Sequence, residues 1–109
     1  MGSDSLAEFE LLVMLAAIRL GPDNAYTVTI AEDIRQRTGR SVRRANVFTV
    51  LQRLEDKKLI STRLGEPRAE RGGRPPRLVT VEAKGVAALR ATTEAIRAMV
   101  GQLRLEDAR

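Results

Sequence analysis

The stretch that decides the fold runs from residue 29 to residue 59 and reads TIAEDIRQRTGRSVRRANVFTVLQRLEDKKL. Its two halves space their apolar residues by three and four positions, as amphipathic helices do, and Gly39 separates them. Two short helices joined by a tight turn that contains glycine are the signature of a helix-turn-helix. We expect Thr27 or Thr29 to cap the first helix and Ser41 to cap the second, which runs over residues 42–57.

Short strands are expected at residues 59–64 and 78–81, with a Gly-, Pro- and Arg-rich loop between them. A helix-turn-helix followed by such a basic hairpin is a winged helix. Ahead of it, residues 5–20 predict a helix capped by Asp4 or Ser5, with apolar side chains on more than one face. The expected fold class is mainly α with a small β-hairpin: a winged helix-turn-helix plus a C-terminal dimerisation helix.

The C-terminal helix is predicted over residues 83–103, where apolar positions recur every three or four residues. Such a seam is typical of a coiled coil, and the alternative is a helix packed on its own domain. The first helix is expected to cover its second apolar face in the same dimer. The predicted dimerisation residues are Leu6, Phe9, Val13, Val86, Leu89, Thr93, Ile96, Val100 and Leu103. One compact unit is expected, with the winged domain over residues 1–81 and the dimerisation helix over 82–109.

Positive charge is concentrated in two segments. Residues 35–53 contain six arginines and no acid, a charge of +6, and residues 63–77 carry +3, whereas residues 1–34 carry −5 and the whole chain +5. A segregated field of this kind steers a protein toward phosphate backbones more effectively than a mild net charge. The distribution therefore indicates a surface that binds a polyanion.

The composition excludes several other functions. The chain contains no cysteine and no histidine, which removes disulfides, thiolate metal sites, cysteine nucleophiles and the usual general base. The longest apolar run, residues 11–18, is too short to cross a bilayer. We expect a cytoplasmic protein that is not an enzyme, carries no cofactor and has no membrane partner.

Three segments of the chain carry a family resemblance: QRTGRSV at 36–42, VFTVLQRLE at 47–55 and RGGR at 71–74. In this order and spacing they resemble the PadR family of bacterial winged-helix transcriptional regulators, over residues 11 to about 103. The short final helix looks like the subfamily with a single C-terminal dimerisation helix. The resemblance implies a homodimer that represses transcription from a roughly palindromic operator and is sometimes released by a small molecule.

Three positions depart from the family pattern. Phe48 stands where tyrosine is usual, so a hydroxyl contact to a phosphate is lost there. Lys58 stands where the family commonly has glycine, so a left-handed conformation at Lys58 would carry strain of about 1 kcal/mol. Glu82 replaces the threonine that usually opens the last helix and is a poorer cap.

The second helix of a helix-turn-helix presents its N-terminal part to the major groove. We expect Arg43 and Arg44 to read guanine and Asn46 to read adenine, with a phosphate contact as the alternative for Arg44. Ser41 and Thr49 are expected to bind phosphates. The remaining predicted DNA-binding residues are Arg53 in the same basic run, the wing arginines Arg68, Arg71 and Arg74, and Tyr26.

The roles of the wing and of Tyr26 are left open by the sequence. The wing arginines can enter a narrow minor groove or clamp the flanking phosphates, or the loop can lack a fixed role. Tyr26 can donate to a phosphate or pack in the core. We interpret the chain as a sequence-specific regulator of double-stranded DNA. The alternatives are a sequence-tolerant architectural DNA-binding protein, a module for an acidic protein partner, and a repressor gated by a small-molecule effector of unknown identity.

Overall fold

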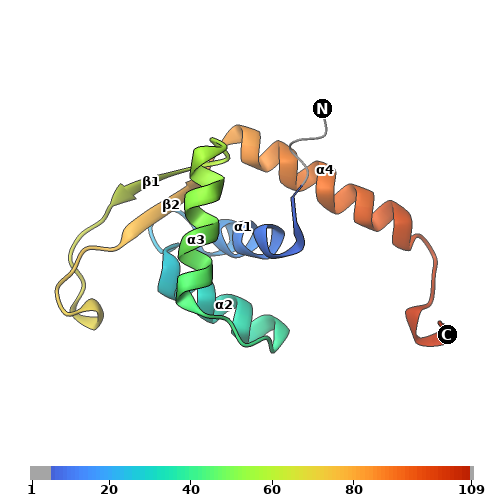
Figure 1. Cartoon of the computed structure of the whole chain (residues 1–109), viewed down its shortest axis with the longest axis horizontal. Helices are drawn as coiled ribbons and strands as arrows, with labels where there is room; N and C mark the ends of the chain where they lie inside the picture. Colours follow the sequence, from blue (N-terminus) through green and yellow to red (C-terminus); the bar gives the residue numbers. More distant parts are fainter. Residues whose placement is uncertain (1–5, 109) are drawn as a thin grey trace.

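The structure is a computed structural model that describes residues 6–108, and it confirms the predicted winged helix (Figure 1). Four helices and a two-stranded antiparallel hairpin account for its regular elements. In chain order they are α1 (Glu8–Leu20), α2 (Thr27–Thr38), α3 (Arg44–Asp56), β1 (Ile60–Leu64), β2 (Arg77–Val81) and α4 (Ala83–Val100), with 3-10 turns at Ala69–Arg71 and Leu105–Asp107. No helix among these residues is both long and apolar enough to cross a membrane.

Helix α1 lies at the centre of the domain. Its residues Val13, Met14 and Ala16 are completely buried, and it packs against α2, α3, α4 and β2. This helix therefore buries more than one face within a single protomer, whereas the sequence predicted that a partner subunit covers the second face. α2 and α3 add Ile30, Val47 and other apolar residues of their inward faces to the same core.

The hairpin pairs Ile60 with Val81 at its base and Leu64 with Arg77 at the start of the wing. β2 is anchored on its other side as well, because the N–H of Val79 donates to the carbonyl oxygen of Ala25 at 2.8 Å. The wing therefore begins from a strand that is held between β1 and the segment ahead of α2.

The first turn of α4 passes unusually close to the end of α3. A Cβ atom at Gly85 would lie 2.3 Å from the carbonyl oxygen of Leu59 and 2.9 Å from the terminal methyl of Met14. Both distances are shorter than real Cβ contacts, so the backbone approach requires glycine. Glu82, the residue at the N-cap of this helix, makes no capping hydrogen bond with its side chain.

Two of the predicted helix caps, those of α2 and α3, are corrected by the structure. Ser41 does not cap α3, which begins later than expected at Arg44 with Arg43 at its N-cap. Thr29 lies in the first turn of α2, where its hydroxyl accepts from the N–H of Tyr26, the residue at the N-cap. A side chain can satisfy the free N–H groups from inside the first turn, which sequence spacing alone does not reveal. Asp4 and Ser5 lie outside the described residues, and α1 begins at Glu8.

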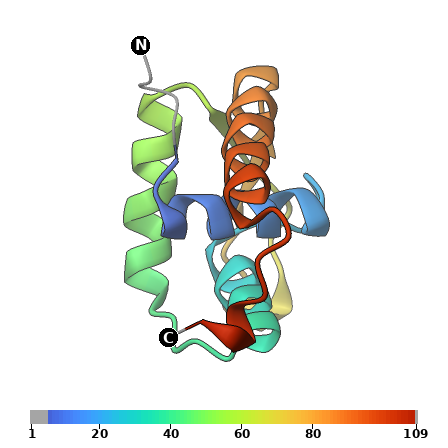
Figure 2. The same ribbon diagram turned by 90° about the vertical axis from the view of Figure 1, so that its right-hand side faces the viewer.

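Helix α4 leaves the body of the domain on the side away from the wing (Figures 1 and 2). The Cα radius of gyration is 15.3 Å, compared with about 13 Å for a compact chain of this length, because this helix projects. Its first half packs on the protomer through Ala88 and Leu89, and its second half is exposed. The helix ends at Val100 and not at the predicted residue 103, since Gly101 takes a positive φ of 50°.

The end of α3 confirms the strain expected at Lys58, which has φ 66° and is the one non-glycine residue with positive φ in the described chain. We predict that Lys58→Gly raises the free energy of unfolding by about 0.5–1 kcal/mol, because relief of side-chain strain exceeds the greater entropy of glycine in the unfolded state. Thermal and urea unfolding measure the change. Lys58→Ala is the matched control, because it removes the charge and keeps the strain; equal stabilisation by both would contradict the strain argument.

Candidate nucleic-acid interface

The exposed face of α3, together with its N-cap Arg43, carries half of the side chains predicted to contact DNA. Val47, Val50, Leu51 and Leu54 fix the helix in the core. This packing leaves Arg43, Arg44, Asn46, Thr49 and Arg53 exposed, and Ser41 is exposed in the preceding turn. The Thr49 hydroxyl already donates to the carbonyl of Ala45 at 3.0 Å, so it must give up that bond to donate to a phosphate.

Half of the arginines in the +6 run are neutralised by acids from elsewhere in the chain. Arg37 pairs with Asp33 at 3.2 Å, Arg40 with Glu8 at 2.6 Å and Arg53 with Glu10 at 3.6 Å. Within the described residues, the arginines of this run that make no salt bridge are Arg35, Arg43 and Arg44. Two of these three, Arg43 and Arg44, lie at the beginning of α3, and Arg35 lies near the end of α2.

Glu10 is the buried acid of the interface, with 5% of its side chain exposed. Its carboxylate accepts from the N–H of Ala7 at 3.0 Å and from Lys57 Nζ at 3.3 Å, and Arg53 lies next to it. Burial by itself would raise the pKa of Glu10, but the hydrogen bonds from Ala7 and Lys57 and the two cations outweigh it and lower the pKa. Glu10 therefore ties the end of α3 to the start of α1.

Asp33 holds α2 against α1 through Arg19, and Glu8 holds the turn of the helix-turn-helix through Arg40. Burial would raise the pKa of Asp33, but the Arg19 and Arg37 guanidinium groups that hydrogen-bond to it lower the pKa overall. The exposed Glu8 has its pKa lowered by the hydrogen bond and charge of Arg40. The acids of residues 1–34 thus act as fixed partners that orient α2 and the turn before α3.

The wing is folded against the beginning of α2. The guanidinium carbons of Arg68 and Arg71 lie 5.4 and 5.3 Å from the centre of the Tyr26 ring, within the range of cation–π attraction. Tyr26 is only 4% exposed, so the structure places its ring in the core, as one of the two sequence interpretations had it. Arg68 also donates to the carbonyl of Asp23 at 2.7 Å, and Arg63 pairs with the Asp23 carboxylate at 2.9 Å.

Two adjoining clefts separate the wing from the helices. One, of about 650 Å³, brings Arg44 of α3 together with Arg71 and Arg74 of the wing, next to Glu32 and Glu70. The side chains of three arginines from two distant segments thus line one opening. The sequence predicted DNA-binding residues on α3 and on the wing as two separate groups, and the structure brings members of both groups to one cleft.

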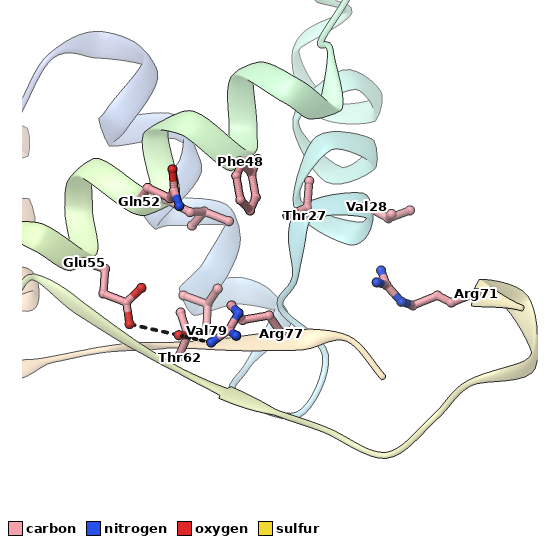
Figure 3. Close-up of a pocket in the computed structure, with 10 residues that line it drawn as sticks. Thr27, Val28, Phe48, Gln52, Glu55, Thr62, Arg71, Arg77 and Val79 are labelled. Carbon is pink, nitrogen blue, oxygen red and sulfur yellow. Dashed lines mark hydrogen bonds between the residues drawn. The ribbon is translucent and has the colours of Figure 1, made fainter. Parts of the chain in front are cut away.

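The second cleft, of about 500 Å³, lies between α3 and the hairpin (Figure 3). Phe48 contributes an apolar wall although half of the residue is exposed. At the opposite side, Arg77 donates to the Thr62 hydroxyl at 3.1 Å, and that hydroxyl donates to Glu55 at 2.9 Å. Sequence reasoning did not select Arg77, Thr62 or Gln52 for this surface. The strand alternation of β1 and β2 was the available signal, since it predicts which side chains share a face of the hairpin.

The predicted dimerisation residues divide into two groups. Leu6, Val13 and Leu89 are buried inside the protomer, and Phe9, Val86 and Thr93 are partly buried there. Ile96, Val100 and Leu103 are exposed, together with Met99, which is 79% exposed and was not predicted. These four side chains and Ala95 line a shallow apolar hollow of about 450 Å³ at the free end of α4. We call this surface the α4 apolar patch.

The arrangement of helices, hairpin and projecting α4 recurs in solved structures of transcriptional regulators. A PadR-like regulator from Bacillus cereus strain ATCC 14579 superposes with a TM-score of 0.66 at 16% identity, covering 86% of this chain and 84% of that one. A PadR family regulator from Eggerthella lenta DSM 2243 gives 0.63 at 20% identity, covering 94% and 88%. The fold is that of the PadR-like regulators.

A third similar structure is a complex of MepR from S. aureus with DNA. It has a TM-score of 0.60 and 20% identity, and the match covers 94% of this chain and 68% of that one. No family model matches the sequence, and a search of curated proteins finds no match. At these identities the likeness establishes the winged-helix fold.

The buried carboxylate gives a prediction for stability and its pH dependence. We expect Glu10→Gln to lower the free energy of unfolding by about 1–2 kcal/mol at neutral pH, because charged hydrogen bonds become neutral ones. The pKa of Glu10 is lower in the folded than in the unfolded protein. The stability difference between wild type and Glu10→Gln should therefore have its full size above the unfolded pKa and should disappear as the pH falls through the folded pKa. Urea unfolding across that range measures it.

The matched control is Glu8→Gln, which breaks an ion pair that lies in solvent. This variant should leave the free energy of unfolding nearly unchanged. A Glu10→Gln effect that stays constant down to acidic pH would show that packing, and not ionisation, is responsible.

Proposed function

We propose that this protein is a transcriptional regulator of the PadR type that binds a specific, pseudo-palindromic operator as a homodimer and represses transcription there. The observation that carries the proposal is the convergence of Arg44, Arg71 and Arg74 on one cleft between α3 and the wing. A surface with unpaired arginines on a helix N-terminus and on an adjoining loop suits a duplex, which offers a groove and two phosphate backbones.

In the proposed complex, the beginning of α3 enters the major groove. Arg43 and Arg44 are free of salt bridges among the described residues and can offer both donors of a guanidinium to guanine, and Asn46 can bind adenine. Ser41 and Thr49 bind phosphates and set the register. Arg53 is the weakest of the proposed DNA contacts, because its nearest partner is the buried Glu10.

The wing is proposed to bind the neighbouring minor groove or the phosphates that flank it. Arg74 is exposed, and Arg71 and Arg68 are partly buried where they lie over the Tyr26 ring. Arginine binds a narrow minor groove through the negative potential there, so these contacts depend on the shape of the duplex. Tyr26 contributes through its ring, as argued below.

We propose that residues 82–109 form the dimerisation segment and that residues 1–81 form the DNA-binding part of the same unit. The support is the α4 apolar patch, which gathers four exposed large apolar side chains on the free end of one helix. Leu6, Val13 and Leu89 are left out of this interface because the protomer itself covers them.

Selection of genomic fragments by the purified protein at near-physiological salt tests the function. Enrichment of an inverted repeat would establish a sequence-specific dimeric regulator. Retention of fragments without a shared motif would instead show an architectural DNA-binding protein, and no retention would reject DNA binding. Transcription from the recovered promoter, with and without the protein, then decides whether the effect is repression.

We predict that Arg43→Ala or Arg44→Ala weakens operator binding by about 1–3 kcal/mol and relaxes base preference at one position of each half-site, because a bidentate contact is lost. Fluorescence anisotropy with single-base variants of the operator measures both effects. Arg97→Ala on α4 is the control, since it removes the same charge far from α3. Equal weakening on operator and random duplex would reassign these residues to phosphates.

The dimer gives a separate prediction. Ile96→Glu and Met99→Glu should each convert a dimer to monomers, because each buries an unpaired charge in the α4 apolar patch. Light scattering measures the molar mass, and circular dichroism should show that the fold is intact. Glu94→Gln, on the same helix, is the control. A variant that remains dimeric would place the interface elsewhere.

A further inference from the structure

We propose that Tyr26 is a positioning residue whose ring holds the wing in the orientation that the DNA-binding surface requires. This inference rests on the proposed function, because it assigns a role within the same surface. It starts from an arrangement in which Arg68 and Arg71 both lie over one buried aromatic ring.

The wing has few other attachments to the body of the domain. The loop leaves the strands after Gly65 and returns at Pro76, where the N–H of Gly65 donates to the carbonyl oxygen of Pro76. Its hydrogen bonds in the described chain are largely internal: the amides of Arg71, Gly73 and neighbouring residues donate to Arg68, Ala69 and Arg71 carbonyls. From residues 66–74, the hydrogen bond to the body is the one that Arg68 donates to Asp23. None of residues 66–74 is buried, so core packing does not hold the loop.

Tyr26 itself is rigidly placed. It is the N-cap residue of α2, its N–H donates to the hydroxyl of Thr29 at 3.0 Å, and its ring is covered almost completely. The loop therefore meets a fixed aromatic face at the beginning of the helix-turn-helix. Two guanidinium groups held at that ring fix both the position of the 3-10 turn Ala69–Arg71 and its direction.

The consequence is a defined position for the cations across the cleft from α3. Arg71 lies on Tyr26 and at the same time lines the cleft with Arg44 and Arg74. A ring contact consumes none of the N–H donors of a guanidinium, so Arg71 can stack on Tyr26 and still bind a phosphate. The two arginines repel each other when both approach the ring, and a phosphate between the wing and α3 would reduce that repulsion. Binding of DNA and attachment of the wing thus favour each other.

This role depends on the aromatic ring and not on the hydroxyl group. A direct phosphate contact from Tyr26, the other interpretation of this residue, depends on the hydroxyl. The variants Tyr26→Phe and Tyr26→Leu therefore separate the two, since phenylalanine keeps the ring and leucine keeps only apolar bulk.

Hydrogen–deuterium exchange of the wing tests the attachment without DNA. Two cation–π contacts predict that Tyr26→Leu speeds exchange of amides in residues 68–74 by about 5- to 30-fold, whereas Tyr26→Phe stays close to wild type. Peptides from α4 serve as the internal control for global destabilisation. Arg68→Met/Arg71→Met should reproduce the fast exchange with Tyr26 present, so the test does not depend on the stability of one variant. Exchange that is the same in wild type and Tyr26→Leu would overturn the proposal.

Binding to mixed-sequence duplex DNA tests the consequence. We expect Tyr26→Leu to weaken binding several-fold and to flatten its salt dependence. Tyr26→Phe should keep both the affinity and the salt dependence of the wild type. Equal weakening by both variants would overturn the proposal in favour of a hydroxyl contact. If the wild type binds no duplex at all, the proposed function fails, and the exchange data still decide whether Tyr26 holds the wing.

Discussion

The burial of α1 on several sides is the constraint on which the other elements depend. A helix in a domain of this size usually leaves one face to solvent, but α1 buries Val13, Met14 and Ala16 completely. Each surrounding element must therefore fit its surface, and α4 can do so only because Gly85 has no side chain at the point of closest approach to Leu59. The direction in which α4 leaves the domain follows from that contact.

The same helix organises the charges. Glu8 and Glu10 stand in its first turn and bind Arg40 before α3 and Arg53 and Lys57 at the end of α3. Together with Asp33 on α2, they remove part of the positive charge that residues 35–53 show as a sequence. The acids orient α2 and α3, and two of the three arginines left unpaired, Arg43 and Arg44, lie at the beginning of α3. The net charge of a sequence segment therefore overstates the electrostatic field at the surface and does not show where that field is strongest.

The elements of this fold could be predicted because helical periodicity, glycine turns and strand alternation are local signals. The strain at Lys58 could also be predicted, but only through the resemblance to a family that commonly has glycine at this position. The caps of α2 and α3 could not, because side chains at neighbouring positions compete for the same N–H groups and geometry decides between them. The candidate site residues were selected one by one from the sequence. That procedure could not detect the pairing of Arg53 with Glu10, because the two positions are 43 residues apart. Nothing local distinguishes such an arginine from Arg44.

The seam in α4 shows how one pattern can serve two purposes. Leu89 and Ile96 occupy the same apolar spacing, but the first lies 5% exposed against the domain and the second 49% exposed beyond it. Periodicity indicates an apolar face of the helix. It does not show which part of that face packs on its own domain and which part extends beyond it. Since α4 points away from the wing, pairing through its free end would leave α3 and the wing of both protomers uncovered (Figure 1). Two-fold symmetry would then fix the distance between the two α3 helices. Both helices can enter the major groove on one side of a duplex only if that distance is about 34 Å, one helical turn of DNA, or a multiple of it. In such a dimer, the direction of α4, constrained by the contact at Gly85, and its length, limited by Gly101, would determine whether two half-sites can be bound together.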